Sequence, residues 1–463
     1  MPRGTVWRAM VVAGVVALAA GVSAGQAPPA AGAPTFSMAL TGDSIITRRL
    51  SVYEEPAFVR LIELVRGADV SFTNLEMLFH DYEPYPMNES GGTYMRAEPA
   101  LVKELVWAGF DLVARANNHT GDYGAEGMRL TTKYVDAVGL VQAGVGESLP
   151  EAREAKYIET AKGRVALISV ASTFPDHARA GRARAGVRGR PGLSPLRYTT
   201  TNVVTRDQLE RLRALLVEMG QRVPAEGDSL TFQRVRFVAG DTPGARTEPR
   251  AEDVEEVAAV VQSASRLADH VIVTFHSHEG QTGNRGAPAD FLVAFAHAMV
   301  DAGADVLLGH GPHVLRGVEI YKGKPILYSV GDFIFQNETL LRLPSENYEP
   351  YDLGPLAGVA DFNAARYTND TRGFPADREI WEAVVAVPTF AGERLLSLEL
   401  HPITLGFSSG PAVRGRPMLA EGELAAKILG DVAERSKPFG TAMVVERGIG
   451  RIVIPASTDA AGR

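Results

Sequence analysis

Five short polar motifs carry the residue types that hold divalent metal ions in proteins. Carboxylate, amide and imidazole groups suit Mn, Fe, Zn and Co, and they also serve metal-assisted hydrolysis. Taken singly, most of the motifs have an ordinary structural explanation, because Gly-Asp is common in turns and Asn caps helices. The last motif is the most specific, since it places two imidazoles three residues apart on a loop restricted by Gly and Pro. In chain order the motifs are Gly42-Asp43-Ser44, Asn74-Leu75-Glu76, Asn117-Asn118-His119, His276-Ser277-His278-Glu279 and Gly309-His310-Gly311-Pro312-His313.

Each motif ends an apolar run that predicts a β-strand. We expect strands at 36–40, 69–76, 112–116, 271–275, 306–308 and 326–330, and helices at 56–66, 101–108, 127–138 and 290–302. Such alternation favours an α/β fold with parallel strands joined by crossover helices. Because ligands gather at the carboxyl ends of parallel strands, the five motifs are expected to meet there. The pattern therefore predicts a site for one or two divalent metal ions.

Composition excludes several alternatives. The chain has 463 residues and no cysteine, which excludes disulfides, a thiol nucleophile, thiolate metal ligands and a lipid-modified cysteine. A formal net charge of -8 argues against nucleic acid as the main partner.

The N-terminus has the pattern of a secretory signal peptide. Arg3 and Arg8 precede an apolar run at 9–22, and small residues lead to Ala24. We expect a signal peptide at 1–24, a linker at 25–34, and export to the periplasm, the cell surface or the medium. An uncleaved membrane anchor is the alternative, although the run is shorter than a typical membrane span.

Two regions depart from the regular alternation. Residues 173–250 are expected to be an insertion, with a solvated loop at 178–190 that holds five arginines and an exposed strand at 229–238. Contact of these arginines with an anionic ligand is a second interpretation of the loop. Residues 341–463 are expected to form a C-terminal extension that completes or flanks the second sheet. Its predicted elements are strands at 383–387 and 395–400, a helix near 424–435 and a final hairpin around 447–450.

Together with Asp122-Tyr123-Gly124 and Ser329-Val330-Gly331-Asp332-Phe333, the motifs in this order resemble the CapA family of capsule, or poly-γ-glutamate, biosynthesis proteins. That family belongs to the calcineurin-like metallophosphoesterase superfamily. The resemblance covers residues 35–340. It implies a metallophosphatase-like four-layer αββα sandwich with a dinuclear metal centre at one edge.

The resemblance also implies roles for individual residues. His119 would contact the substrate and protonate a leaving oxygen, and Asp122 would orient His119. The usual Asp-x-His of the superfamily is replaced by Asp43-Ser44-Ile45, so one ligand is missing and His278 is a candidate replacement. The implied metal ligands are Asp43, Glu76, Asn118, His276, His310 and His313.

Other polar residues receive weaker predictions. Arg49 and Arg115 are candidates for contact with an anionic substrate or for exposed positions, and Asp332 is expected to hold loops together. The remaining histidines fit no motif and are expected to be surface or core residues; they are His80, His177, His270, His297 and His401.

The leading functional hypothesis is an exported, metal-dependent hydrolase of phosphoester or similar bonds that acts in capsule or envelope-polymer biosynthesis. Its expected partners are an anionic polymer or phosphoester substrate and membrane-bound capsule synthesis components. The missing Asp-x-His ligand motivates the alternative, a non-catalytic binding or assembly protein for an anionic polymer. A scavenging nucleotidase or phosphatase is the third hypothesis.

Overall fold

A computed structural model describes residues 34–455. The expected signal peptide at 1–24 and all but the last residue of the linker at 25–34 lie outside the described residues. Within the described part, no helix combines the length and the apolar character needed to cross a membrane. The described residues form a mixed α/β fold.

The larger of two main sheets has ten strands and is built around β1 (Phe36–Ile45). Its path runs β25-β26-β23-β22-β1-β2-β5-β6, with β21 also paired to β1 and β24 to β23. The strands β1, β2, β5, β6 and β21 are parallel, whereas β22 joins β1 in antiparallel register. The other bounds are β2 Val70–Leu75, β5 Leu112–Ala114, β6 Val141–Ala143, β21 Asp332–Phe335, β22 Glu382–Ala391, β23 Arg394–Thr404, β24 Met418–Leu419, β25 Met443–Glu446 and β26 Ile449–Ile452.

The second main sheet has six strands in the order β19-β20-β18-β15-β9-β8. Its four central strands are parallel, and the two edge strands pair in antiparallel fashion. The bounds are β8 Lys156–Thr160, β9 Gly163–Ala171, β15 His270–His276, β18 Val306–His310, β19 Val318–Tyr321 and β20 Lys324–Leu327.

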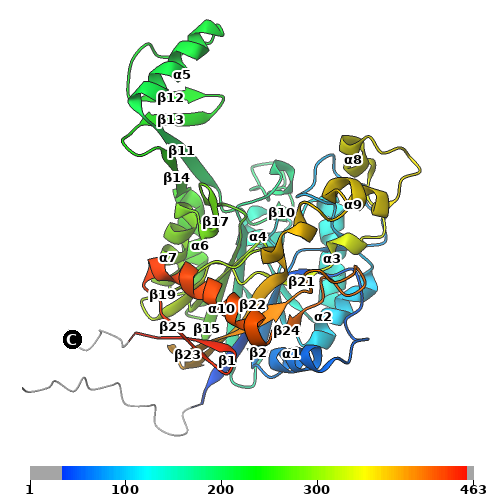
Figure 1. The fold of residues 1–463 in the computed structure, drawn as a ribbon. Helices are drawn as coiled ribbons and strands as arrows, with labels where there is room; N and C mark the ends of the chain where they lie inside the picture. Colours follow the sequence, from blue (N-terminus) through cyan, green and yellow to red (C-terminus); the bar gives the residue numbers. More distant parts are fainter. Residues whose placement is uncertain (1–33, 456–463) are drawn as a thin grey trace, which may run out of the picture. The chain divides into compact units, whose positions relative to one another are not determined.

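The two sheets pack face to face, and helices cover their outer faces (Figure 1). One core cluster joins Leu40 and Phe72 of the larger sheet to Leu167 and Ile272 of the smaller sheet. Helices α1 (Pro56–Arg66), α2 (Val102–Ala108) and α3 (Gly124–Ala137) lie at the right of Figure 1 and cover the larger sheet. Helices α6 (Ala251–Ala264) and α7 (Asp290–Asp301) lie at the left and cover the smaller sheet.

The central elements follow from their apolar patterns. All seven residues of β15 are buried, as expected for a parallel strand covered on both faces. Helix α1 starts at Pro56, whose fixed φ suits the first turn, and buries Phe58, Leu61, Ile62 and Val65 along one face. These elements confirm the predicted strand at 271–275 and the predicted helix at 56–66.

Residues 198–249 form a separate four-stranded sheet in the order β12-β13-β11-β14. Helix α5 packs on it through Leu209 and Leu216, and Thr205 and Gln208 form a capping box at the start of the helix. The single exposed strand predicted at 229–238 is wrong, because Gln233 and Arg234 have positive φ and turn the chain between β12 and β13. The bounds are β11 Tyr198–Val204, α5 Arg206–Glu218, β12 Ser229–Phe232, β13 Val235–Ala239 and β14 Gly244–Pro249.

The arginine-rich loop at 178–190 packs on the main body rather than being wholly solvated. Ala178 and Ala180 are buried, and the strand β10 (Gly192–Leu193) that follows pairs with β7 (Val145–Gly146). Arg182 forms an ion pair with Glu256 of α6. Four of the five arginines are nevertheless exposed at the surface.

The chain after β21 returns to the larger sheet. The hairpin β22–β23 pairs with β1, and the hairpin β25–β26 extends the same sheet. Helix α10 (Gly422–Ser436) packs into the core between the sheets through Ile428 and Leu429. Between β21 and β22 lie α8 (Ser345–Tyr348), α9 (Val359–Tyr367) and the 3-10 turns η5 (Phe374–Ala376) and η6 (Arg378–Trp381).

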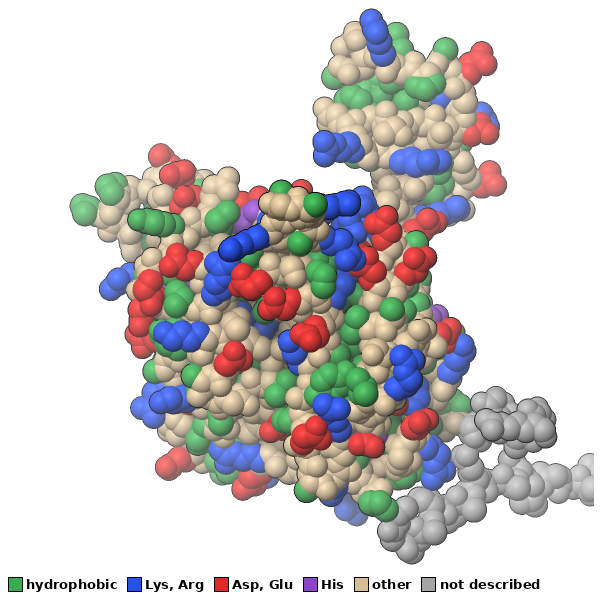
Figure 2. Space-filling view, turned by 180° about the vertical axis from the view of Figure 1, so that it is seen from behind, with side chains coloured by type: hydrophobic (Ala, Val, Ile, Leu, Met, Phe, Trp, Pro, Cys, Tyr) green, Lys and Arg blue, Asp and Glu red, His purple; other side chains and the backbone are tan. Residues whose placement is uncertain are grey.

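Surface charge is mixed over much of the molecule. Lys and Arg side chains lie among Asp and Glu side chains over the face shown in Figure 2. The net negative charge therefore does not produce a uniformly acidic surface on that face.

Candidate metal centre

The five polar motifs meet where strands of the two sheets end. Asp43 of β1 lies opposite Asn74 at the end of β2, and His276 of β15 lies opposite His310 at the end of β18. Glu76 follows β2 directly. Side chains from both sheets thus reach one buried region.

Three overlapping groups of side chains have the spacing of metal ligands. They are Asp43 with His276 and His310, Glu76 with His276 and His278, and Asp43 with Glu76 and His313. Within each group the ligand atoms lie within 4.8 Å of one another. Asp43 Oδ1 is 3.5 Å from His310 Nδ1, and Glu76 Oε1 is 3.8 Å from His276 Nε2. Two ligands about 2.1 Å from one ion are about 3.0–3.4 Å apart at 90–110°, so small adjustments bring these atoms onto a cation.

Buried atoms without partners provide a second test of the fit. Both carboxylate oxygens of Glu76, Oδ1 of Asn118 and Nε2 of His310 are buried and have no hydrogen-bond partner among the described residues. Leaving such groups unpaired costs free energy, and a cation would satisfy oxygen and nitrogen lone pairs together. The donor set therefore fits one or two divalent ions.

Electrostatics keeps most of the imidazoles in the form that binds metals. Burial lowers the pKa of His310 to about 4. Burial, followed by the neighbouring imidazoles, lowers the pKa of His276 and His278 well below the usual value. These three rings are neutral at pH 7 and have a free lone pair. Burial, followed by the charge of Asp43, raises the pKa of Glu76 well above its usual value, as expected for carboxylates that share a site without a cation.

His313 and Asp332 form a buried pair at the edge of this region. His313 Nδ1 lies 2.8 Å from Asp332 Oδ1. Burial alone would lower the pKa of His313, but the charges of Asp332 and Glu76 outweigh it and raise that pKa to about 10. Burial raises the pKa of Asp332 to about 6 although His313 opposes this. A carboxylate in this position fixes the ring and leaves Nε2 directed toward Glu76, at 3.9 Å.

The residues of the Asn117-Asn118-His119 motif have different structural roles. Asn117 fixes the loop, since its Nδ2 donates to the Leu75 carbonyl and its Oδ1 accepts from the His119 N–H. Asn118 donates to the Gly91 carbonyl and keeps its own oxygen free. A side chain at Gly91 would collide with the Asn118 backbone, which explains glycine at this close approach.

His119 lies beside the candidate ligands and is held by a carboxylate. Its Nδ1 is 2.7 Å from Asp122 Oδ2, and its Nε2 is 3.7 Å from Glu76 Oε1. Asp122 also accepts backbone N–H bonds from Gly91 and Met95, so the carboxylate itself is fixed. The arrangement directs one nitrogen of His119 toward the centre.

His278 occupies the position of an additional imidazole. Its Nε2 lies 3.2 Å from His276 Nε2, and its backbone N–H donates to Thr173 Oγ1. The neighbouring Glu279 accepts from the hydroxyls of Ser172 and Ser277 and anchors the loop. His278 therefore stays a candidate ligand with Glu76 and His276.

Two further motif residues support the ligands, although the sequence alone predicts no separate role for either. Asn74 donates to Asp43 Oδ1 at 2.7 Å and orients that carboxylate. Gly311, at φ +109°, donates its N–H to Asp43 Oδ2, and a side chain there would approach the His276 ring to 3.0 Å. Asn after a strand is too common to single out, but Gly311 lies inside the most specific motif.

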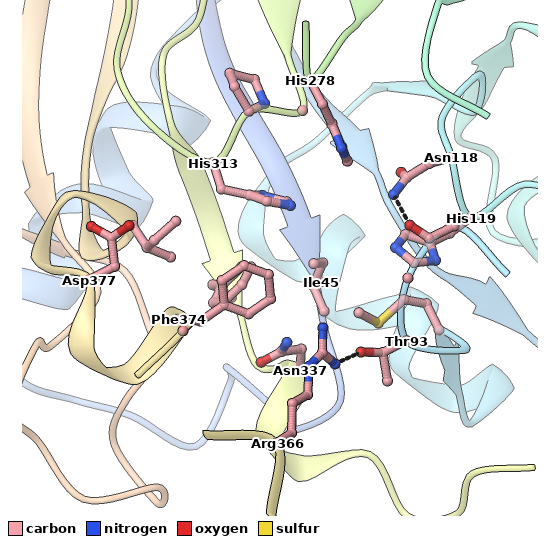
Figure 3. A pocket seen from close by; sticks show the side chains of 18 of the residues that line it. Ile45, Thr93, Asn118, His119, His278, His313, Asn337, Arg366, Phe374 and Asp377 are labelled. Carbon is pink, nitrogen blue, oxygen red and sulfur yellow. Dashed lines mark hydrogen bonds between the residues drawn. The ribbon is translucent and has the colours of Figure 1, made fainter. Parts of the chain in front are cut away.

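A pocket of about 790 Å³ opens beside the centre. Figure 3 shows His119, His278 and His313 pointing from different sides toward a common space, with Asn118 beside His119. The opposite wall comes from chain-distant residues that carry no motif, among them Thr93, Asn337, Arg366 and Phe374.

The predictions for Arg115 are wrong, and neither it nor Arg49 lines this pocket. Arg115 is 1% exposed and donates to Gln142 and to the Met128 carbonyl, so it is neither exposed nor available to a substrate. Arg49 is exposed and forms an ion pair with Glu104. The histidines outside the motifs are not members of the three ligand groups, and His80, for example, is buried against Tyr123.

Comparisons with known proteins bear out the family resemblance that the sequence suggested. The sequence model of the family described as "Bacterial capsule synthesis protein PGA_cap" matches residues 23–337. An uncharacterized protein, y4sH, of Sinorhizobium fredii is 38% identical over 435 residues, which cover 90% of this chain and 93% of that protein. Capsule biosynthesis protein CapA of Bacillus anthracis is 24% identical over 307 residues, covering 65% of this chain and 60% of its own length. PGA biosynthesis protein CapA of Bacillus subtilis is 26% identical over 292 residues, covering 60% of each chain.

Proposed function

Since the chain belongs to the bacterial capsule synthesis protein PGA_cap family, we propose that it is an exported, metal-dependent hydrolase of phosphoester or similar bonds in the biosynthesis of an anionic envelope polymer. The observation that carries the proposal is the convergence of Asp43, Glu76, His276 and His310 from strands of two sheets. Two β-sheets packed face to face under outer helices are compatible with the metallophosphatase-type αββα sandwich, which forms part of the proposal.

The metal-binding side of the proposal rests on a defined ligand set. Asp43, His276 and His310 would hold one ion, and Glu76 would hold a second ion with His278 or His313, because a neutral His276 has a lone pair for one ion alone. Asn118 would add an amide oxygen. Divalent cations bound there would supply Lewis-acid activation of a phosphoryl group and of water. Imidazole and carboxylate ligands suit Mn, Fe, Zn and Co.

The protein's own residues supply positioning and proton transfer. His119 donates a proton from Nε2 to the leaving oxygen, because its Nδ1 is engaged with Asp122. Gly311 and Asn74 hold the Asp43 carboxylate in a single orientation through hydrogen bonds to its two oxygens. The ligand side chains are buried, and the lower local dielectric strengthens electrostatic interactions with the substrate.

The test is hydrolysis of bis(4-nitrophenyl) phosphate by the protein loaded in turn with Mn²⁺, Zn²⁺, Co²⁺ and Fe²⁺. Wild type should release nitrophenolate with at least one of these ions, and His310→Ala should lose this activity. Exposed Arg211→Gln on α5 is the control and should retain it. Absence of turnover with every ion would contradict the hydrolase proposal.

A second candidate function is binding or assembly of the anionic polymer without turnover. The first motif favours it, because Ser44 bonds to Thr73 and Ile45 is a buried apolar residue, so neither supplies the ligand usual in the superfamily. The exposed arginines of the loop at 178–190 offer positive charge for such a polymer. Binding of polyglutamate that survives chelation, without cleavage of phosphodiesters, would support this function instead.

A further inference from the structure

Part of one wall of the pocket lies beyond the part of the chain that the family match covers. The match ends at residue 337, whereas α9 and the turns η5 and η6 supply Arg366, Phe374 and Arg378 to the pocket lining. The metal ligands and this part of the wall therefore belong to different parts of the sequence.

Arg366 is held in a fixed position on this wall. Its guanidinium lies 5.2 Å from the ring centre of Tyr367 and 5.5 Å from that of Phe374, at cation–π distances. One of its terminal nitrogens donates to the Thr93 hydroxyl. Figure 3 shows the side chain directed into the pocket beside Asn337 and Thr93, on the side opposite His278 and His313.

Arg366 differs from the other arginines around the pocket in having no carboxylate partner within residues 34–455. Arg285 pairs with Asp377 and Glu379, and Arg378 pairs with Glu382. The nearby Arg414 pairs with Glu338. Arg366 is partly buried, and a guanidinium offers a planar set of donors that matches a carboxylate or a phosphoryl group.

Asn337 lies on the same wall and contacts Tyr367, the neighbour of Arg366 in the sequence. Its side chain is 4% exposed and lines the pocket, and its amide oxygen has no hydrogen-bond partner among the described residues. Its nitrogen donates to the Tyr367 hydroxyl, which fixes the amide beside Arg366. Because an amide oxygen accepts hydrogen bonds and an anion has none to donate, Asn337 supports the wall beside Arg366 and does not itself bind the anionic group.

We propose that Arg366 is a specificity-determining residue that binds a second anionic group of the substrate, a carboxylate or a phosphoryl group, while the metal centre holds the first. The inference rests on the proposed function, because it assigns the chemistry of the substrate taken by the same pocket. It restricts that substrate to molecules with at least two anionic groups separated by a spacer.

The experiment compares equilibrium binding of two series of probes to the metal-loaded protein by calorimetry. One series consists of alkylphosphonates of increasing chain length, and the other consists of ω-carboxyalkylphosphonates of the same lengths. Wild type should bind a carboxylated probe at least tenfold more tightly than its uncharged counterpart at one or more spacer lengths. A third series of α,ω-alkylenediphosphonates, measured in the same way, shows whether the pocket prefers a carboxylate or a phosphoryl group as the second anionic group.

Three variants separate the role of Arg366 from a structural one. Arg366→Gln should lose the tenfold preference and keep the affinity for alkylphosphonates, while Arg366→Lys should retain part of the preference because it keeps the charge. Arg211→Gln, an equal change of charge on exposed α5, should bind like wild type. Where Arg366→Gln fails to fold, Arg366→Lys still tests the geometry of the guanidinium.

Two outcomes would overturn the inference. In the first, wild type shows no preference for the carboxylated or diphosphonate probes, or binds no probe at all. In the second, the preference persists in Arg366→Gln. Turnover of bis(4-nitrophenyl) phosphate is measured separately on the same samples. Absence of turnover with an intact binding preference would remove the hydrolase proposal and leave the anion-binding role of Arg366 standing.

Discussion

The sharpest prediction concerns substitution of Glu76, because its effect on the stability of the folded protein should have opposite signs in the metal-free and the metal-loaded protein. In the metal-free protein both carboxylate oxygens of Glu76 are buried without partners, near the carboxylate of Asp43. With metal bound, the same oxygens become ligands. Glu76→Gln keeps the shape and removes the charge, so it should stabilise the metal-free protein and destabilise the metal-loaded one.

The magnitude follows from metal linkage and from the size of the folded unit. A ligand at 1,000 times its Kd stabilises the folded state by about 4.1 kcal/mol. An unfolding entropy of about 2.1 cal/mol/K per residue over residues 34–455 gives about 0.9 kcal/mol/K. One bound ion should therefore raise Tm by about 5 °C, and Glu76→Gln should lose most of that rise. Removal of the cost of burying an ionisable carboxyl beside Asp43, offset by burial of an amide, should raise the metal-free Tm by about 1–3 °C.

The assay is thermal unfolding in EDTA and in saturating Mn²⁺ or Zn²⁺. Glu104→Gln is the matched control, because Glu104 is also buried but accepts hydrogen bonds from the Leu50 and Ser51 N–H groups. That variant should lower Tm in both conditions and leave the metal-induced rise unchanged. A Glu76→Gln variant that behaves like Glu104→Gln would refute the assignment of Glu76 as a ligand.

Three further predictions test other parts of the account. His310→Ala should lower the metal content by at least about one ion per chain, as measured by elemental analysis, while circular dichroism shows that the protein stays folded. An unchanged metal content would exclude His310 as a ligand. Asp122→Asn should reduce phosphodiester turnover by about 10–100-fold at unchanged metal content, because His119 loses its orienting carboxylate. The loss should be larger for substrates with poor leaving groups, which depend more on protonation by His119. Equal losses for good and poor leaving groups would argue against His119 as the acid. Burial lowers the pKa of His80 to about 4, so between about pH 6.5 and pH 4 the unfolded chain binds a proton at this residue that the folded chain does not. The stability of the folded protein therefore falls as pH falls through this range, and His80→Gln should make the fall shallower by up to about 1.4 kcal/mol per pH unit in urea titrations. An unchanged slope would contradict the burial of a neutral ring.

The parallel core could be predicted from sequence because its signals are local. Runs of Val, Ile, Leu and Phe predict β15 and β18, and a single apolar face predicts α1. The predicted strands at 383–387 and 395–400 lie within β22 and β23, and the final hairpin is formed by β25 and β26. The pairing of β22 with β1 has no local signal in the sequence, because it depends on which edge of the sheet is unpaired in the folded protein.

The errors lie where tertiary contacts override local pattern. One omission is of another kind, because helix α6 was not predicted although Val257, Val261 and Ala264 recur at helical spacing and share its buried face. Arg115 follows a strand at the edge of the site, yet its guanidinium turns to Gln142 inside the protein. Two residues with positive φ divide the stretch at 229–238 into two strands, which neither Gln233 nor Arg234 suggests by type.

The candidate ligands were accessible to prediction, whereas the opposite pocket wall was not. Asp43, Glu76, Asn118, His276, His310 and His313 lie in motifs at strand ends, where topology forces convergence. Arg366 and Asn337 lie in a part of the chain with no such motif, and only the folded chain brings them opposite the histidines.

The most direct measurement of the central claim is the metal content of the full chain purified without chelator. Elemental analysis should find about one or two equivalents of Mn, Fe, Zn or Co per chain, consistent with the overlapping ligand groups around Asp43 and Glu76. Protein that carries no transition metal, and whose Tm does not change when these ions are added, would contradict the account.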